Sequence, residues 1–178
     1  MTKSSSPGLC SLAWKRIAMT ESAQRISLKR ILAPTDFSDC AAASLKYASA
    51  LAERFDADLF VLHVAQDFTL ALTATDLGFP PPEQLREELT EQAKSKLAEL
   101  PGGSWNIKSV TREVRWGNPW QEITKFAMET QIDLIVLGTH GRSGLSHLFL
   151  GSVAERVVRA APCPVLTVRP EGHQFVAT

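Results

Sequence analysis

A chain of 178 residues, 44% of them hydrophobic, is long enough for one compact core and too short for two full-sized domains. Its 19 basic and 19 acidic residues cancel, which excludes the overall cationic field that draws proteins to nucleic acid or anionic membranes. No apolar run approaches the roughly 20 residues of a membrane-spanning helix, and the three cysteines lack the spacing of a zinc site or a disulfide framework. We therefore expect a cytoplasmic protein that binds neither nucleic acid nor membrane.

Three segments are expected along the chain: an extension over residues 1–28, a domain over 29–170 and a tail over 171–178. The first twenty residues contain Lys3, Lys15 and Arg16 and no acid, a composition that faintly resembles an organelle transit segment. They lack the apolar core of a secretory signal. We favour a disordered extension, or an overlong start with Met19 as the real one.

The domain begins with a strand, a helix and a second strand. Residues 30–34 form a brief apolar run, and Ser38 after it can cap a helix that extends to about Phe55. The apolar residues of 58–64 are nearly continuous rather than alternating, which predicts a strand buried on both faces. Residues 65–80 are rich in turn formers and show no period.

The second half of the domain continues the alternation. Residues 81–100 are the clearest helix, with proline at the start and Leu85, Leu89, Ala93 and Leu97 at four-residue spacing. Residues 106–115 form a strand with polar interruptions, which suits a sheet edge. The remaining predicted elements are a helix from about 117 to 130, a strand over 133–138, a helix over 153–160 and a strand over 164–168.

Five strands that alternate with four helices predict right-handed crossovers and a doubly wound, five-stranded parallel sheet with helices on both faces. In such α/β sheets, ligands bind at the carboxyl ends of the strands, near the point where the strand order reverses.

A glycine-rich stretch follows one of these carboxyl ends. Gly138 and Gly141 are followed, after nine intervening residues, by Gly151 and Ser152 at the start of a helix. Helix N-termini favour anions, and glycines let backbone amides approach a phosphate closely. The spacing is not a Walker A loop, because no lysine precedes the final hydroxyl residue, and it is not G-x-G-x-x-G.

This pattern after an apolar strand resembles the ATP-binding signature of the universal stress protein family. The flanking sequences agree, with ILAPTDFS at residues 31–38, LHV at 62–64 and VAERVVRAAPCPVLTVR at 153–169. The resemblance covers residues 29–170. It implies a Rossmann-like fold of the adenine nucleotide alpha hydrolase type.

The resemblance also implies a nucleotide site. Asp36 and Val64 would hold the adenine and ribose, Gly138 would lie along the ribose and phosphates, and the later motif residues would line the phosphates. A Mg²⁺ or Mn²⁺ ion would be held mainly by the phosphates. The complete expected set is Pro34, Thr35, Asp36, Val64, Gly138, Thr139, Gly141, Arg142, Gly151, Ser152 and Val153.

Several of these residues have a second interpretation. Asp36 could help to cap the first helix beside Ser38, and Arg142 could face solvent instead of phosphate. His63, inside an apolar strand, is expected to be a hydrogen-bonded core histidine. For His140 and His147, an exposed position in the loop without a role is the commoner case, although either could contact phosphate.

The functional expectation is a nucleotide-dependent regulatory module of the stress response, in which ATP orders the glycine loop and changes the surface that meets an unknown protein partner. The alternatives are a slow metal-dependent ATPase and an ATP-independent dimeric interaction protein. An enzyme is disfavoured because the loop offers no lysine and no carboxylate base. The apolar strand at 164–168 should lie at a sheet edge and pair with a second copy, unless residues 1–28 cover it.

Overall fold

The structure is a computed structural model that describes residues 26–66, 83–140, 150–170 and 176. The strands and helices within these ranges alternate as the sequence predicts. In chain order they are β1 (Arg30–Thr35), α2 (Asp39–Phe55), β2 (Asp58–Ala65), α4 (Glu83–Ala98), β3 (Ser109–Trp116), α5 (Pro119–Glu129), β4 (Leu134–Gly138), α6 (Ser152–Ala160) and β5 (Val165–Val168).

The strands form one sheet in the order β3-β2-β1-β4-β5, and every neighbouring pair is parallel. The chain starts at the centre with β1, moves outward to β3, and then returns to the other side of β1 for β4 and β5. The order therefore reverses between β1 and β4, where open α/β sheets bind ligands. The predicted doubly wound sheet is confirmed, with β3 and β5 at its two edges.

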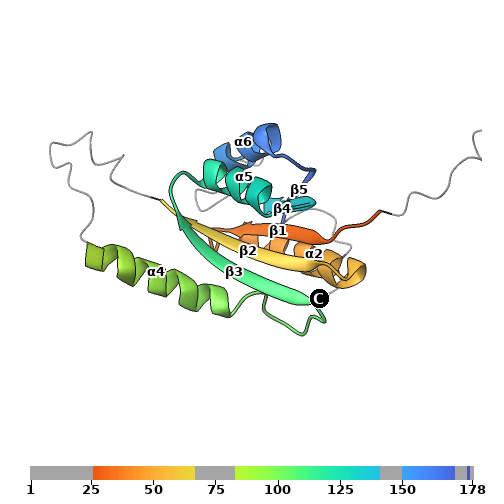
Figure 1. The fold of residues 1–178 in the computed structure, drawn as a ribbon, viewed down its shortest axis with the longest axis horizontal. Helices are drawn as coiled ribbons and strands as arrows, with labels where there is room; N and C mark the ends of the chain where they lie inside the picture. Colours follow the sequence, from red (N-terminus) through yellow and green to blue (C-terminus); the bar gives the residue numbers. More distant parts are fainter. Residues whose placement is uncertain (1–25, 67–82, 141–149, 171–175, 177–178) are drawn as a thin grey trace, which may run out of the picture.

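Helices cover both faces of the sheet. Side chains from α2 and α4 pack on one face, and those from α5 and α6 pack on the other; in Figure 1, α5 and α6 lie above the strands and α4 lies below them. Each face has its own cluster of buried side chains, and neighbouring residues of β1 divide between the two: Ile31 packs toward α2, whereas Leu32 packs toward α5 and α6. Both are completely buried. Because side chains alternate along a strand, a strand covered on both sides must be apolar throughout.

Helix α2 begins with the predicted serine cap. The Ser38 hydroxyl accepts a hydrogen bond from the Ala41 amide at 3.2 Å, which satisfies one of the free N–H groups of the first turn. The helix ends at Asp56, whose left-handed conformation (φ 53°) stops the α-helical path. The Ser38 cap fixes where α2 begins after β1, and so positions the start of α2 at the carboxyl end of β1.

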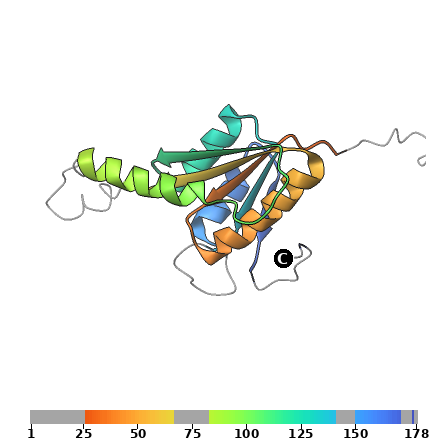
Figure 2. The ribbon, with the colours of Figure 1, turned by 90° about the horizontal axis from the view of Figure 1, so that it is seen from below.

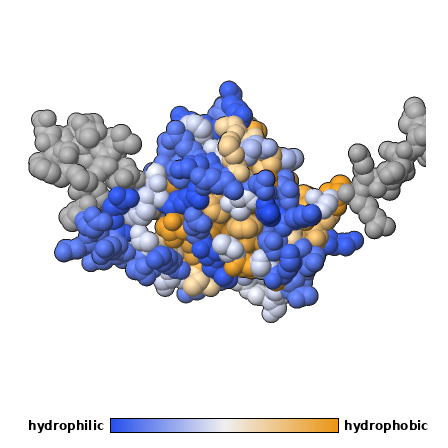
Figure 3. Space-filling model, in the orientation of Figure 1, coloured by the Kyte–Doolittle hydropathy of each residue, from blue (hydrophilic) through white to orange (hydrophobic). Residues whose placement is uncertain are grey.

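Helix α4 meets the sheet along only part of its length. Of the four residues predicted to form its apolar face, Ala93 and Leu97 are buried, whereas Leu85 and Leu89 remain 43% and 37% exposed. The N-terminal half of α4 extends past the carboxyl ends of the strands, as Figure 2 shows. Hydrophilic residues dominate its outer surface (lower left of Figure 3). Within the described ranges, no helix is both long and apolar enough to span a bilayer.

Candidate functional site

A cavity of about 670 Å³ opens at the carboxyl ends of β1, β2 and β4. Small-molecule sites in proteins typically have volumes of roughly 300–1,000 Å³. Residues from α2 and α4 close the cavity on one side of the sheet, and residues from α5 and α6 close it on the other. It lies at the reversal of strand order between β1 and β4.

Every residue of the expected nucleotide site that the structure describes lines this cavity. Four separate stretches of chain supply them, because the carboxyl ends of parallel strands meet at the same edge of the sheet. They are Pro34, Thr35, Asp36, Val64, Gly138, Thr139, Gly151, Ser152 and Val153. The other two, Gly141 and Arg142, fall outside the described residues, as does His147.

Asp36 takes part in the cap of α2 and also lines the cavity. Its Oδ1 accepts hydrogen bonds from the Ser38 amide at 3.0 Å and from the Ser38 hydroxyl at 2.6 Å. These bonds orient the residue that caps α2, so Asp36 supports the helix cap. It also lines the cavity. The carboxylate thus lies between the start of α2 and the space that a ligand would fill.

Phe37 has a left-handed backbone conformation, with φ at 64°. This conformation is costly for a bulky side chain and is common at binding sites. Its amide donates to Thr35 Oγ1 at 3.0 Å, which helps to hold the turn. The Phe37 ring lies 4.5 Å from the His63 ring, centroid to centroid, and both residues line the cavity.

His63 is hydrogen-bonded as expected, but it is not enclosed in the core. Its Nδ1 lies 2.8 Å from the Thr35 carbonyl oxygen, so Nδ1–H is the donor. The side chain is half-buried and forms part of the cavity wall. The expectation of a core histidine was wrong because the apolar run of β2 ends here, at the open edge of the sheet.

Packing within the protein explains why residue 138 is a glycine. A β-carbon at this position would lie 2.6 Å from Cys40 Sγ and 2.9 Å from the Cys40 carbonyl oxygen, closer than real Cβ contacts. Glycine therefore lets the first turn of α2 pack against the end of β4. The sequence-based explanation, close approach to a phosphate, is not required at Gly138, although its backbone does line the cavity.

Gly151 precedes α6, and its amide is hydrogen-bonded within the protein. That amide donates to the Thr139 carbonyl at 2.7 Å, and a β-carbon on Gly151 would lie 3.1 Å from the same oxygen. The first hydrogen bond of the helix runs from the Glu155 amide to the Gly151 carbonyl at 2.9 Å. The amides of the next three residues therefore lack a partner within the helix. These residues, Ser152, Val153 and Ala154, line the cavity.

His140 is less exposed than the sequence suggested. Its Nδ1 lies 3.0 Å from Thr139 Oγ1, and its Nε2 is buried with no hydrogen-bond partner among the described residues. If the Thr139 hydroxyl donates to Nδ1, then Nε2 carries the proton. A buried polar nitrogen beside a helix N-terminus is a site that a ligand oxygen can satisfy.

Sequence reasoning did not predict the cavity wall formed by α4 and by the end of β3. Leu89, Gln92, Ala93 and Lys96 line the cavity from α4, and Trp116 lines it from β3. The α4 residues recur at the three- and four-residue spacing of a helix face. That spacing was visible in the sequence, but the position of this face over the cavity depends on the strand order.

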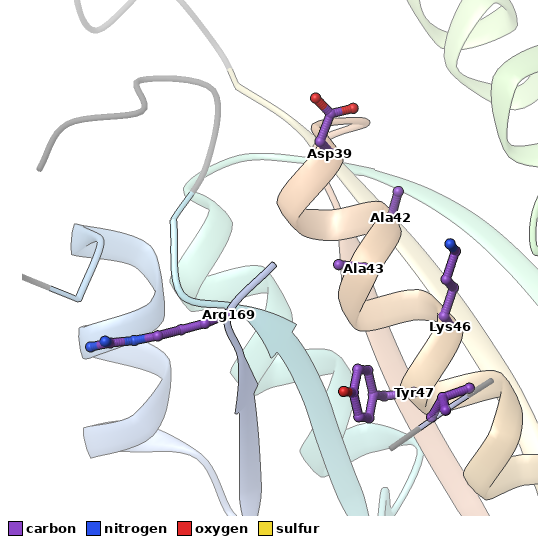
Figure 4. A pocket seen from close by; sticks show the side chains of 7 residues that line it. Asp39, Ala42, Ala43, Lys46, Tyr47 and Arg169 are labelled. Carbon is purple, nitrogen blue, oxygen red and sulfur yellow. The ribbon is translucent and has the colours of Figure 1, made fainter. Parts of the chain in front are cut away.

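The described residues contain no group of three or more His, Cys, Asp or Glu side chains placed to hold a metal ion. A second, smaller hollow of about 250 Å³ lies beside α2 and includes Arg169, the residue directly after β5. Asp39, Ala42, Ala43, Lys46 and Tyr47 project from α2 along it, while Arg169 extends away from the helix (Figure 4). None of the expected site residues lines this hollow.

A doubly wound parallel sheet with a cavity at its switch point defines a Rossmann-like α/β protein. The chain belongs to the universal stress protein family, whose family model matches residues 27–169.

Relatives by sequence include universal stress protein MJ0531 of Methanocaldococcus jannaschii, which is 36% identical over 141 residues, 79% of this chain and 82% of its own length. Universal stress protein YxiE of Bacillus subtilis is 34% identical, with 79% of this chain and 98% of its own length covered.

Solved structures of the family share the fold. That of protein MJ0577 of Methanocaldococcus jannaschii has a TM-score of 0.67 at 30% identity and covers 83% of this chain and all (100%) of its own. A universal stress protein in complex with cAMP has a TM-score of 0.55 at 22% identity, with coverage of 81% of this chain and 98% of its own.

Proposed function

We propose that this protein is a nucleotide-binding regulatory module of the stress response that takes ATP into the cavity at the strand ends. The observation that carries the proposal is the start of α6, where the Ser152, Val153 and Ala154 amides line the cavity without helical partners. The positive end of the helix dipole adds to their attraction for phosphate oxygens. His140 lies in the same wall, and its Nε2 has no hydrogen-bond partner among the residues that the structure describes.

The rest of the cavity wall suits the base and sugar. Asp36 offers a carboxylate to hydroxyl or amino donors, and Val64 offers apolar surface from β2. A nucleotide needs both kinds of surface, polar groups for its phosphates and apolar groups for its base. The binding residues proposed are those expected from the sequence, including Gly141 and Arg142, with His140 added from the structure.

A Mg²⁺ or Mn²⁺ ion fits this arrangement only as a companion of the phosphates. Among the described lining residues, Asp36 is the sole carboxylate, and its Oδ1 already accepts two hydrogen bonds from Ser38. A divalent ion bound with the nucleotide would neutralise phosphate charge. The residues of this chain would hold the phosphates by backbone amides.

The regulatory role follows from the same residue set. Phosphoryl transfer requires cations at the phosphates and a group that orients the nucleophile, and the described lining residues place no second carboxylate near the α6 amides. Bound ATP is therefore expected to persist. Slow hydrolysis is the competing outcome.

The test begins with the nucleotide content of the purified full chain, followed by calorimetric titration with ATP, GTP, AMP and cAMP in Mg²⁺. Solved relatives of the same fold include complexes with cAMP and with dAMP, so AMP-type ligands belong in the series. We expect ATP to bind and to remain intact for hours in single-turnover assays. A chain that carries no nucleotide, and whose melting temperature no nucleotide raises, would instead be an ATP-independent interaction protein.

A further inference from the structure

Helix α4 contributes a cation to the cavity wall. Among the described residues that line the cavity, Lys96 is the only lysine or arginine. It belongs to the α4 face formed by Leu89, Gln92, Ala93 and Lys96, whose last two turns are anchored on the sheet by the buried Ala93 and Leu97. The position of the Lys96 backbone is therefore fixed by packing, although its side chain is exposed.

The Lys96 side chain reaches from α4 to Phe37, another residue of the cavity wall. Its Nζ lies 5.5 Å from the centroid of the Phe37 ring. Lys94, two residues earlier, instead pairs with Glu91 on the outer surface at 2.8 Å, and its side chain is 59% exposed. A lysine over an aromatic face keeps its charge and is only partly solvated. Its ammonium remains available to a stronger, anionic partner.

The two positive features of the cavity come from opposite sides of the sheet. Helix α4 lies on the same side as α2, and α6 lies on the other (Figure 1). A ligand between them would meet the Lys96 ammonium on one side and the α6 amides on the other. Positive groups in a cleft raise both the local concentration and the association rate of an anionic ligand, and the Asp36 carboxylate in the same wall opposes part of this attraction.

We propose that Lys96 is a specificity-determining residue of the cavity, which pairs with an anionic oxygen of the ligand and favours phosphorylated nucleosides over uncharged ones. The proposal rests on the proposed nucleotide function. It assigns a ligand contact to α4, outside the glycine pattern and the strand ends.

A contact from the ligand to Lys96 would also restrain α4. The N-terminal half of this helix is held to the sheet by Trp116, whose Nε1 donates to Thr90 Oγ1 at 3.0 Å and whose ring lies 4.8 Å from the Arg86 guanidinium carbon. An ion pair at Lys96 would add an attachment that exists only with ligand bound. Amide hydrogen exchange in α4 should therefore slow when ATP binds.

The experiment compares Lys96→Met with Lys94→Met, a control on the same helix, and with Lys96→Arg, which retains the charge. Binding of ATP and adenosine is measured by NMR titration up to millimolar concentrations at low and high salt. We expect Lys96→Met to weaken ATP binding by at least about fivefold at low salt, the scale of a charge-assisted hydrogen bond, and to leave adenosine unchanged. Lys94→Met and Lys96→Arg should bind ATP nearly as the wild type does.

Hydrogen exchange gives a second readout. ATP should slow exchange in α4 of the wild type and of Lys94→Met, but not of Lys96→Met. Equal ATP affinity in Lys96→Met and wild type, or the same loss for adenosine as for ATP, would overturn the proposal. A wild-type chain that binds no ATP would instead contradict the proposed nucleotide function itself.

Discussion

Gly151 is the N-cap of α6 and Ser152 is its first residue, and their backbone amides have different roles. The Gly151 amide bonds to Thr139 within the protein, whereas the Ser152 amide is one of the three without a helical partner. A side chain on Gly151 would press on the Thr139 carbonyl at 3.1 Å and shift the amides that follow. Glycine here positions the amides of its neighbours.

The first prediction concerns these amides. Gly151→Val should weaken ATP binding by more than about tenfold, or 1.4 kcal/mol, because the displaced helix start no longer presents its N–H groups to the phosphates. Gly141→Val should have a similar effect, and Arg142→Ala a smaller one. Titration calorimetry on folded protein measures all three. A dominant arginine effect, with both valine variants binding normally, would refute a backbone-based site.

The second prediction separates the two roles of Asp36. Asp36→Ala should cost about 1–3 kcal/mol in ATP affinity, because it removes a charged acceptor from the ligand, and about 1 kcal/mol in unfolding free energy, because the Ser38 cap loses its support. Ser38→Ala should lose similar stability and keep ATP binding. Urea unfolding and calorimetry on both variants give the comparison. Asp36 would be purely structural if Asp36→Ala also bound ATP at full strength.

At the scale of elements, the contact between α2 and β4 shapes the cavity. The end of β4 reaches the first turn of α2 only because Gly138 has no β-carbon next to Cys40. Sequence patterns predicted both elements and the Ser38 cap of α2, since these depend on local periodicity and on residues close in the chain. The Gly138–Cys40 contact spans almost a hundred residues, and no local pattern records it.

The third prediction tests this packing. Gly138→Ala should lower the unfolding free energy by about 1–3 kcal/mol, because α2 must move away from β4 to admit the methyl group. Gly102→Ala is the matched control, since the nearest atom to its β-carbon would be 4.0 Å away. Equilibrium urea unfolding measures both. Equal unfolding free energies for the two variants would show that α2 can move away from β4 without loss of stability.

At the scale of the whole molecule, β5 forms one edge of the sheet. The Pro164 carbonyl accepts a hydrogen bond from the Ile135 amide of β4 at 3.1 Å, and the Val168 carbonyl accepts one from the Thr139 amide, directly after β4, at 3.0 Å. Because backbone groups alternate in direction along a strand, Leu166 also faces β4, and the N–H and C=O groups of Val165 and Thr167 face outward. We propose that this outer row pairs with β5 of a second copy, antiparallel and about a two-fold axis.

The fourth prediction follows from this alternation. Thr167→Pro removes an outward donor and should weaken the dimer while the domain stays folded, whereas Leu166→Pro should disrupt the β4–β5 ladder itself. Light scattering and circular dichroism separate the two effects.

The full chain and a version that starts at Met19 are compared in the same way. Monomers at micromolar concentration in both forms would exclude the dimer. A dimer in the shorter form alone would show that the N-terminal extension covers the edge.

The sequence by itself determined the family, the alternation of strands and helices, and the strand-end residues that line the cavity. Periodicity, capping and glycine spacing are local, and parallel strands bring their carboxyl ends together whatever the lateral order.

Only the tertiary structure decided that Lys96 lies over Phe37, that His140 is buried at Nε2, and that Gly138 makes room for Cys40. Each of these features depends on residues from different elements that come together only in the folded chain. They depend on strand order and on how helices pack across the sheet, which a linear pattern of residues does not specify.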